Sequence, residues 1–164
     1  MSTVRLRRMS RSGADLALLL LGSYRRLVDT VVEELAARGH PDVRPAHDFA
    51  MRAVAAGADS ASELGRRLAV SKQAAAKTIA VLLERGYLER EPDPHDARRK
   101  RLTVTARGWD VMHQGEAIFD ELRADWARRL GADELARLEQ HLAAIAGDRA
   151  VQVGEPGWAS QALD

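Results

Sequence analysis

The side chains best suited to specific hydrogen bonding cluster between residues 71 and 86. Read as a helix, this segment turns apolar residues to one side, namely Ala75, Ile79 and Leu82. The opposite side carries polar and small residues: Lys72, Gln73, Ala76, Lys77 and Ala80. Glutamine can bond bidentately to adenine, lysine can donate to guanine O6 and N7, and alanine permits close approach to thymine methyl groups. This face therefore suits the major groove of duplex DNA.

Two short helices must position that face. Ser60 or Ser62 can cap the first helix, which ends near residues 69–70. Ser71 can cap the second helix, and its hydroxyl and the helix N-terminus can hold a phosphate. Small residues stand where the two helices must pack closely: Gly65, Ala69 and Ala75. The pattern predicts a helix-turn-helix, although a plain helical hairpin with a solvated face has the same pattern.

A β-hairpin is predicted directly after the second helix. Residues 87–90 form one candidate strand, and residues 101–105 alternate polar and apolar side chains as a second strand does. The connecting loop is rich in proline and aspartate and ends in charged residues, which are Asp96, Arg98, Arg99, Lys100 and Arg101. Such a loop suits a DNA-binding wing, whose arginine enters the narrow minor groove, with Asp96 orienting Arg98 or stabilising the turn. The alternative is a solubilising basic loop.

Amphipathic segments at 14–38, 107–130 and 132–147 flank this unit, and a short helix is predicted at 45–56. We therefore expect a mainly α fold, a winged helix-turn-helix with a two-stranded wing and terminal dimerisation helices. The expected DNA-binding domain covers 45–108, the dimerisation region 14–38 and 109–147, and flexible tails 1–13 and 148–164. The apolar helices exceed what the small central unit can cover, so a homodimer is predicted.

Composition and charge fit this interpretation. The 164 residues are 46% hydrophobic, which is enough for a globular core. Residues 66–101 hold ten Lys and Arg against five Asp and Glu, whereas residues 110–164 hold five Arg against eleven acidic residues. A basic middle followed by an acidic end indicates that one part of the chain meets a polyanion.

The sequence lacks the residues and motifs that several other classes of protein require. The absence of cysteine excludes disulfides and thiol chemistry and fits a cytoplasmic protein. The arginines before the leucine run at 16–21 resemble a signal peptide, but apolar spacing continues to Leu35 and the run is too short to cross a membrane. The five histidines are dispersed, and nucleophile and phosphate-loop motifs are missing. We expect no enzymatic activity, no cofactor, no metal and no membrane partner.

The motifs between residues 71 and 108 resemble those of the multiple-antibiotic-resistance regulator (MarR) family. The family's D-x-R wing motif falls on Asp96 and Arg98, and its L-x-L-T-x-x-G motif on residues 102–108, with Val104 in place of the second leucine. The resemblance implies an obligate homodimer that represses genes by occupying pseudo-palindromic operators. It also implies release of DNA when a small, often phenolic, ligand binds near the dimer junction.

An aromatic or phenolic effector would need a cavity with aromatic and basic side chains. The candidates are Tyr24, Arg25, His47, Met51 and Trp109, although residues at such helical spacing also form ordinary cores. The alternative function is a winged helix interaction module or dimer adaptor that does not touch DNA.

Arg98→Ala is expected to weaken binding to double-stranded operator DNA by about 1–3 kcal/mol, because the minor-groove contact would be lost. Fluorescence anisotropy with a labelled operator measures this loss, and light scattering checks that the dimer stays intact. An unchanged affinity would remove the wing from the mechanism.

Overall fold

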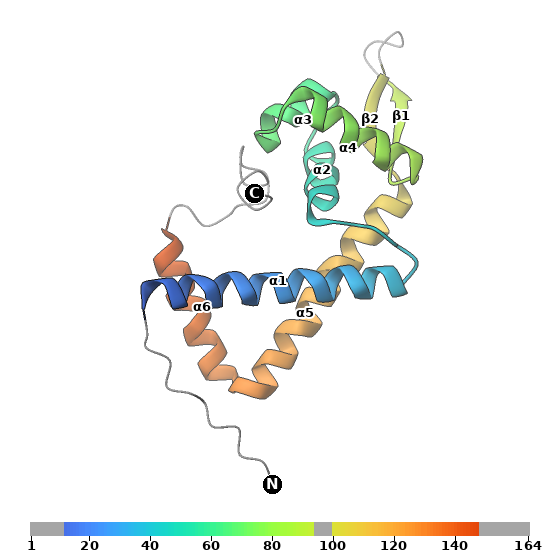
Figure 1. The fold of residues 1–164 in the computed structure, drawn as a ribbon. Coiled ribbons are helices and arrows are strands. Elements are labelled where there is room, and N and C mark those ends of the chain that lie inside the picture. The colour runs from blue at the N-terminus through green and yellow to red at the C-terminus, as the bar shows by residue number, and fades with distance from the viewer. Residues whose placement is uncertain (1–11, 94–99, 148–164) are drawn as a thin grey trace.

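The computed structural model describes residues 12–93 and 100–147, and within these it has six helices and one antiparallel hairpin (Figure 1). In chain order the elements are α1 (Gly13–Ala37), α2 (Pro45–Ala55), α3 (Ala61–Leu68), α4 (Lys72–Glu84), β1 (Leu88–Pro92), β2 (Lys100–Val104), α5 (Ala106–Leu130) and α6 (Ala132–Ala146). The predicted long helices lie within one residue of these bounds. The predicted fold class, mainly α with a two-stranded wing, is confirmed.

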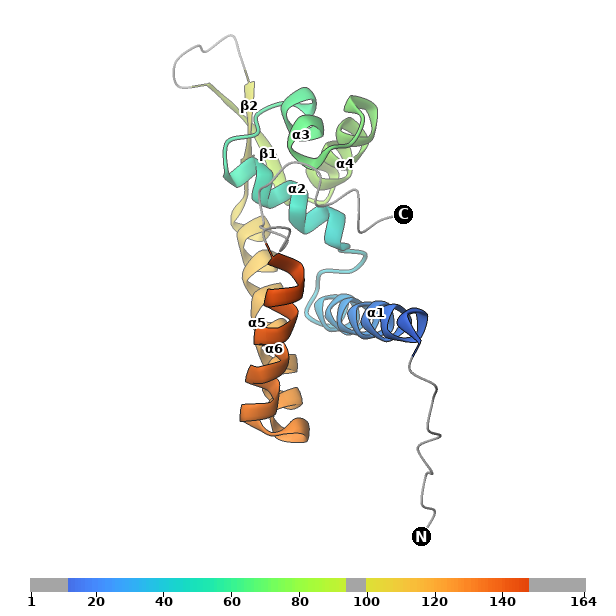
Figure 2. The ribbon, with the colours of Figure 1, turned by 90° about the vertical axis from the view of Figure 1, so that its left-hand side faces the viewer.

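The elements α2, α3, α4, β1 and β2 form one compact part, which we term the winged helix unit. Figures 1 and 2 show α3, α4 and the hairpin at one end of the molecule, with α5 running away from them towards α6. Buried apolar side chains from every element of the unit share one core, including Met51, Val54, Leu64, Leu68, Ile79, Leu82, Leu88 and Leu102. This core sets the directions of α4 and the hairpin.

The turn between α3 and α4 depends on Gly65. A Cβ added there would lie 2.9 Å from the carbonyl oxygen of Val70, so only glycine allows this approach. Ala69 is predicted from the sequence to pack in the same way, but that prediction is wrong. Ala69 is exposed and has a left-handed φ of 50° at the end of α3, a conformation that costs an alanine about 1 kcal/mol. The constraint at this position is one of backbone geometry.

A tight joint connects the hairpin to α5. The Thr105 hydroxyl donates to the Gly86 carbonyl oxygen at 2.6 Å and accepts from the Gly108 N–H at 3.0 Å, which caps α5. A Cβ on Gly108 would overlap the Tyr87 carbonyl oxygen and lie 2.7 Å from Val104 Cγ1. The threonine and glycine of the predicted L-x-L-T-x-x-G motif therefore hold the wing to the long helix.

His40 ties α1 to the same joint. Within residues 12–93 and 100–147, it is the one buried residue with a polar or charged side chain other than Tyr87. Its Nδ1 lies 3.1 Å from the Tyr87 hydroxyl, and its Nε2 lies 3.0 Å from Asp110 Oδ2 on α5. Arg107 covers the Tyr87 ring and donates to the Gly39 carbonyl oxygen at 3.0 Å. The end of α1 is thus held by polar contacts as well as by apolar packing.

The long helices leave much apolar surface uncovered. In α1 the only fully buried residues are Val31 and Leu35, in the half that packs against α5. Large apolar side chains are exposed along the first half of α1 and on α5 and α6: Leu16, Leu18, Leu19, Leu20, Leu21, Tyr24, Phe119, Leu130, Leu138, Leu142 and Ile145. Although many leucines are exposed, no helix in the described ranges is both long enough and apolar enough to cross a membrane. Most of the predicted tail residues, 1–11 and 148–164, lie outside the described residues.

Gly108→Ala is expected to lower the free energy of unfolding by about 2 kcal/mol or more, because the new Cβ must displace backbone. Gly115→Ala, in the same helix, places its Cβ in open space and should raise stability by up to about 1 kcal/mol. Urea unfolding of both variants measures the two effects. Equal stabilities would contradict the close fit at the joint.

Candidate nucleic-acid interface and an adjacent cavity

The two faces of α4 are as the sequence predicts. Ala75, Ile79 and Leu82 are buried against the winged helix unit. The residues of the opposite face are all exposed: Lys72, Gln73, Ala76, Lys77 and Ala80. The Ser71 side chain accepts the Ala74 N–H at 3.1 Å and caps the helix, which leaves its own O–H free to donate. The structure therefore brings the predicted side chains together on one accessible helical face.

The lysines of this face are available for an outside partner. Within the described residues, neither Lys72 nor Lys77 forms an ion pair, and α4 has no acidic residue in its first turn. The arginines of α3 differ, because both Arg66 and Arg67 bind Glu63, the latter at 2.8 Å. Hydrogen bonds from Arg67 and Arg66 lower the pKa of the Glu63 carboxyl. Arg66 and Arg67 thus share one carboxylate on α3, whereas Lys72 and Lys77 of α4 pair with no acidic side chain among the described residues.

The hairpin stands beside α4 at the same end of the molecule (Figures 1 and 2). Leu88 and Leu102 are buried and anchor the two strands, which pair antiparallel with Pro92 opposite Lys100. Lys100 and Arg101 are exposed near the tip, and Arg101 lies 3.6 Å from Glu91 across the strands. The predicted wing-tip residues Asp96, Arg98 and Arg99 lie outside the described residues.

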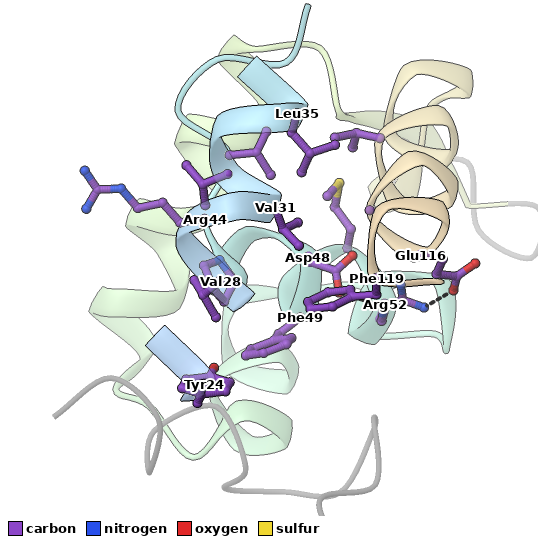
Figure 3. Close-up of a pocket in the computed structure, with 16 residues that line it drawn as sticks. Tyr24, Val28, Val31, Leu35, Arg44, Asp48, Phe49, Arg52, Glu116 and Phe119 are labelled. Carbon is purple, nitrogen blue, oxygen red and sulfur yellow. Dashed lines mark hydrogen bonds and ion pairs between the residues drawn. The ribbon is translucent and has the colours of Figure 1, made fainter. Parts of the chain in front are cut away.

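A cavity of about 330 Å³ lies between α1, α2 and α5, next to the winged helix unit. Most of its lining is apolar, and it includes three aromatic rings, those of Tyr24, Phe49 and Phe119 (Figure 3). The volume and apolar lining are those of a small-molecule site. The cavity is lined both by the long helices α1 and α5 and by α2 of the winged helix unit.

The polar groups of the cavity are joined through Arg52. Its Nε lies 2.7 Å from Asp48 Oδ2, and its Nη1 lies 2.9 Å from Glu116 Oε1 on α5. Burial raises the pKa of Asp48, and the Glu116 charge acts in the same direction, while the hydrogen bond from Arg52 opposes them. The i, i+4 spacing of Asp48 and Arg52 is visible in the sequence. Nothing in the sequence indicates that Arg52 also pairs with Glu116.

Two of the five predicted effector residues line this cavity, namely Tyr24 and Met51. Arg25, His47 and Trp109 do not, and Trp109 instead lines a second hollow between the end of α2 and β2. The His47 Nδ1 accepts the Arg44 N–H at 3.3 Å at the start of α2. Burial, together with the charges of Arg85 and Arg44, lowers the pKa of His47. His47 is thus placed as part of a helix start rather than in the cavity wall.

The fold is that of a winged helix-turn-helix protein, and comparison with known proteins makes this more specific. A family profile described as the MarR family matches residues 49–99. The reduced form of MarR from E. coli is 24% identical with a TM-score of 0.63, and the match covers 80% of this chain and 96% of that one. A mutant of S. aureus MepR bound to an oligodeoxyribonucleotide is 16% identical with a TM-score of 0.62, covering 83% and 96%. S. aureus MepR bound to ethidium bromide is 16% identical with a TM-score of 0.58, covering 82% and 94%.

At these identities the solved structures show a shared fold. The family match begins within α2 and ends at residue 99, just before β2, and the matches to the three solved structures cover 80–83% of the chain. The resemblance to the MarR family predicted from the sequence is therefore confirmed, and the chain has the fold of a MarR-family regulator.

Stability should depend on pH through His47. Because its pKa is lowered on folding, the unfolded chain binds a proton near pH 6.5 more readily than the folded chain. The free energy of unfolding should therefore fall as the pH drops from about 7.5 to about 5.5. Urea unfolding at both pH values should show a smaller drop for His47→Gln than for the wild-type protein. An unaltered drop in His47→Gln would contradict this assignment.

Proposed function

We propose that this protein is a sequence-specific transcription regulator that binds double-stranded DNA as a homodimer and acts as a ligand-responsive repressor. The observation that carries the proposal is the exposed face of α4. Lys72, Gln73 and Lys77 project from it without partners among the described residues, at the same end of the molecule as the basic hairpin. A helix with this surface fits the major groove of B-DNA.

Each contact follows from side-chain chemistry. Gln73 and Lys77 would read base edges, as a bidentate partner of adenine and a donor to guanine, while Ala76 allows the backbone to approach. Ser71, Lys72 and the N-terminus of α4 would hold phosphates and set the register. Lys100 and Arg101 would meet the backbone beside the wing. The proposed minor-groove contacts of Arg98 and Arg99, with Asp96 in support, concern residues outside the described ranges. The complex of MepR with an oligodeoxyribonucleotide supports this use of the fold.

A second copy of the chain would cover the apolar side chains of α1, α5 and α6. Leu18 and Leu19 are 66% and 62% exposed, and Ile145 is 79% exposed. Apolar surface of this extent is costly in water, and pairing of two identical chains buries it twice over. The dimer would present two α4 helices to successive major grooves, which predicts a pseudo-palindromic operator.

The cavity between α1, α2 and α5 would hold a small aromatic or phenolic effector. Its aromatic lining suits such a ligand, and its walls belong partly to the winged helix unit and partly to the long helices. A ligand that binds one arrangement of these parts better than the other would shift the protein away from its DNA-binding form. The complex of MepR with ethidium bromide supports a ligand site in a protein of this fold.

Selection from fragmented genomic DNA of the source tests the proposal. Bound fragments should be enriched in a pseudo-palindrome with half-sites about one helical turn apart, and light scattering should give the mass of two chains. Gln73→Ala should weaken binding to that operator by about 1–3 kcal/mol. Arg128→Ala, a change of another exposed side chain at the far end of α5, is the control and should leave binding unchanged where light scattering still gives the mass of two chains.

Two outcomes would contradict the proposal. Recovery of DNA without any shared motif would indicate a non-specific binder, and recovery of no DNA would favour a winged helix interaction module.

A further inference from the structure

We propose that the cavity between α1, α2 and α5 selects an aromatic cation, whose positive charge lies between Asp48 and Glu116 in competition with Arg52. This inference rests on the proposed effector role of the cavity and adds the charge of the ligand. It depends on three features of the cavity: the balance of its charges, the burial of one carboxylate and the position of its aromatic rings.

The hydrogen-bonded cluster in the cavity has more carboxylates than guanidinium groups. Two carboxylates, Asp48 and Glu116, share the single guanidinium of Arg52 at 2.7 and 2.9 Å. Arg44 also lines the cavity, but its side chain is exposed and Figure 3 shows its guanidinium pointing away from the other three groups. The cluster of Asp48, Arg52 and Glu116 therefore carries one negative charge in excess, and a bound cation would neutralise it.

Asp48 is the carboxylate with most to gain from a second cation. Its side chain is only 28% exposed, and the Nε of Arg52 contacts Oδ2 of its carboxylate at 2.7 Å. Burial raises its pKa even with Arg52 in place, so its negative charge is incompletely compensated. A cationic group bound beside Asp48 would form a charge-assisted hydrogen bond with a carboxylate that is mostly shielded from water.

The rest of the lining favours a cationic ligand that contains an aromatic ring over a simple ammonium ion. Tyr24, Phe49 and Phe119 present ring surfaces within the same cavity (Figure 3). Aromatic faces attract cations as well as other rings. An anion such as a phenolate would instead have to approach two carboxylates and draw Arg52 away from both. The same cavity therefore discriminates against the anionic form of a phenolic ligand.

Competition for Arg52 also supplies a means of regulation. The Arg52–Glu116 ion pair joins α2 of the winged helix unit to α5, and the Glu116 side chain is 56% exposed. A cation that occupies Glu116 weakens this link at the point where the winged helix unit meets the long helices. Ligand charge and the position of α4 are thereby coupled.

Three probes that share one naphthyl ring and differ in charge test the inference: naphthylmethyl-trimethylammonium, naphthylmethanol and naphthylacetate. Isothermal titration of the full-length chain should give a dissociation constant about tenfold lower for the cation than for the neutral probe, and weaker binding still for the anion. Glu116→Gln and Asp48→Asn should each lower the ratio of the affinity for the cation to that for the neutral probe to near one, whatever their effect on the neutral probe alone. Glu116 is half-exposed, so its variant should fold even if the Asp48 variant does not.

Glu121→Gln is the matched control, because Glu121 lies on α5, pairs with Arg38 at 3.1 Å and is not part of the cavity lining. It should keep the wild-type preference for the cation. Equal affinities for all three probes, or tighter binding of the anion, would overturn the inference and leave the cavity an effector site of another class. Failure of every probe to bind, with operator binding intact, would overturn the inference together with the effector part of the proposed function but not its DNA-binding part.

Discussion

The joint between β2 and α5 is the constraint on which the rest of the molecule depends. Thr105 links the Gly86 carbonyl to the first turn of α5, and the absence of a side chain at Gly108 lets that turn lie against the Tyr87 backbone. Since the second strand of the wing runs directly into α5, this contact sets the angle between hairpin and long helix. His40 extends the joint to α1 through Tyr87 and Asp110.

Two kinds of link therefore join the winged helix unit to the long helices. In the joint around Thr105, Tyr87 and His40, the His40 and Tyr87 side chains are buried, and the hydrogen bonds of Thr105 are partly buried. The Arg52–Glu116 pair is half-exposed and borders a cavity, so water, ions and ligands can compete for it. The winged helix unit is therefore attached to the long helices by one partly buried joint and by one more exposed ion pair.

The small size of the core explains the apolar surface of the long helices. The winged helix unit is held by its own buried residues, whereas the first half of α1 and most of α6 contribute almost none. A helix with leucines on nearly every side, as in residues 16–21, is not stabilised by its own propensity alone. Within one copy, the first half of α1 and most of α6 therefore gain little stability from apolar burial.

The sequence by itself determined the elements and the accessible face of α4. Helical periodicity, the serine caps and the alternating strand of the hairpin are short-range signals, and a buried Ile79 with an exposed Gln73 follows from 3.6 residues per turn. Only the tertiary structure decided which distant residues meet. The pairing of Arg52 with Glu116, the burial of His40 between Tyr87 and Asp110, and the left-handed turn at Ala69 depend on how the helices pack. Local patterns carry no information about such contacts, because a side chain's partner 64 residues away is set by the shape of the whole core.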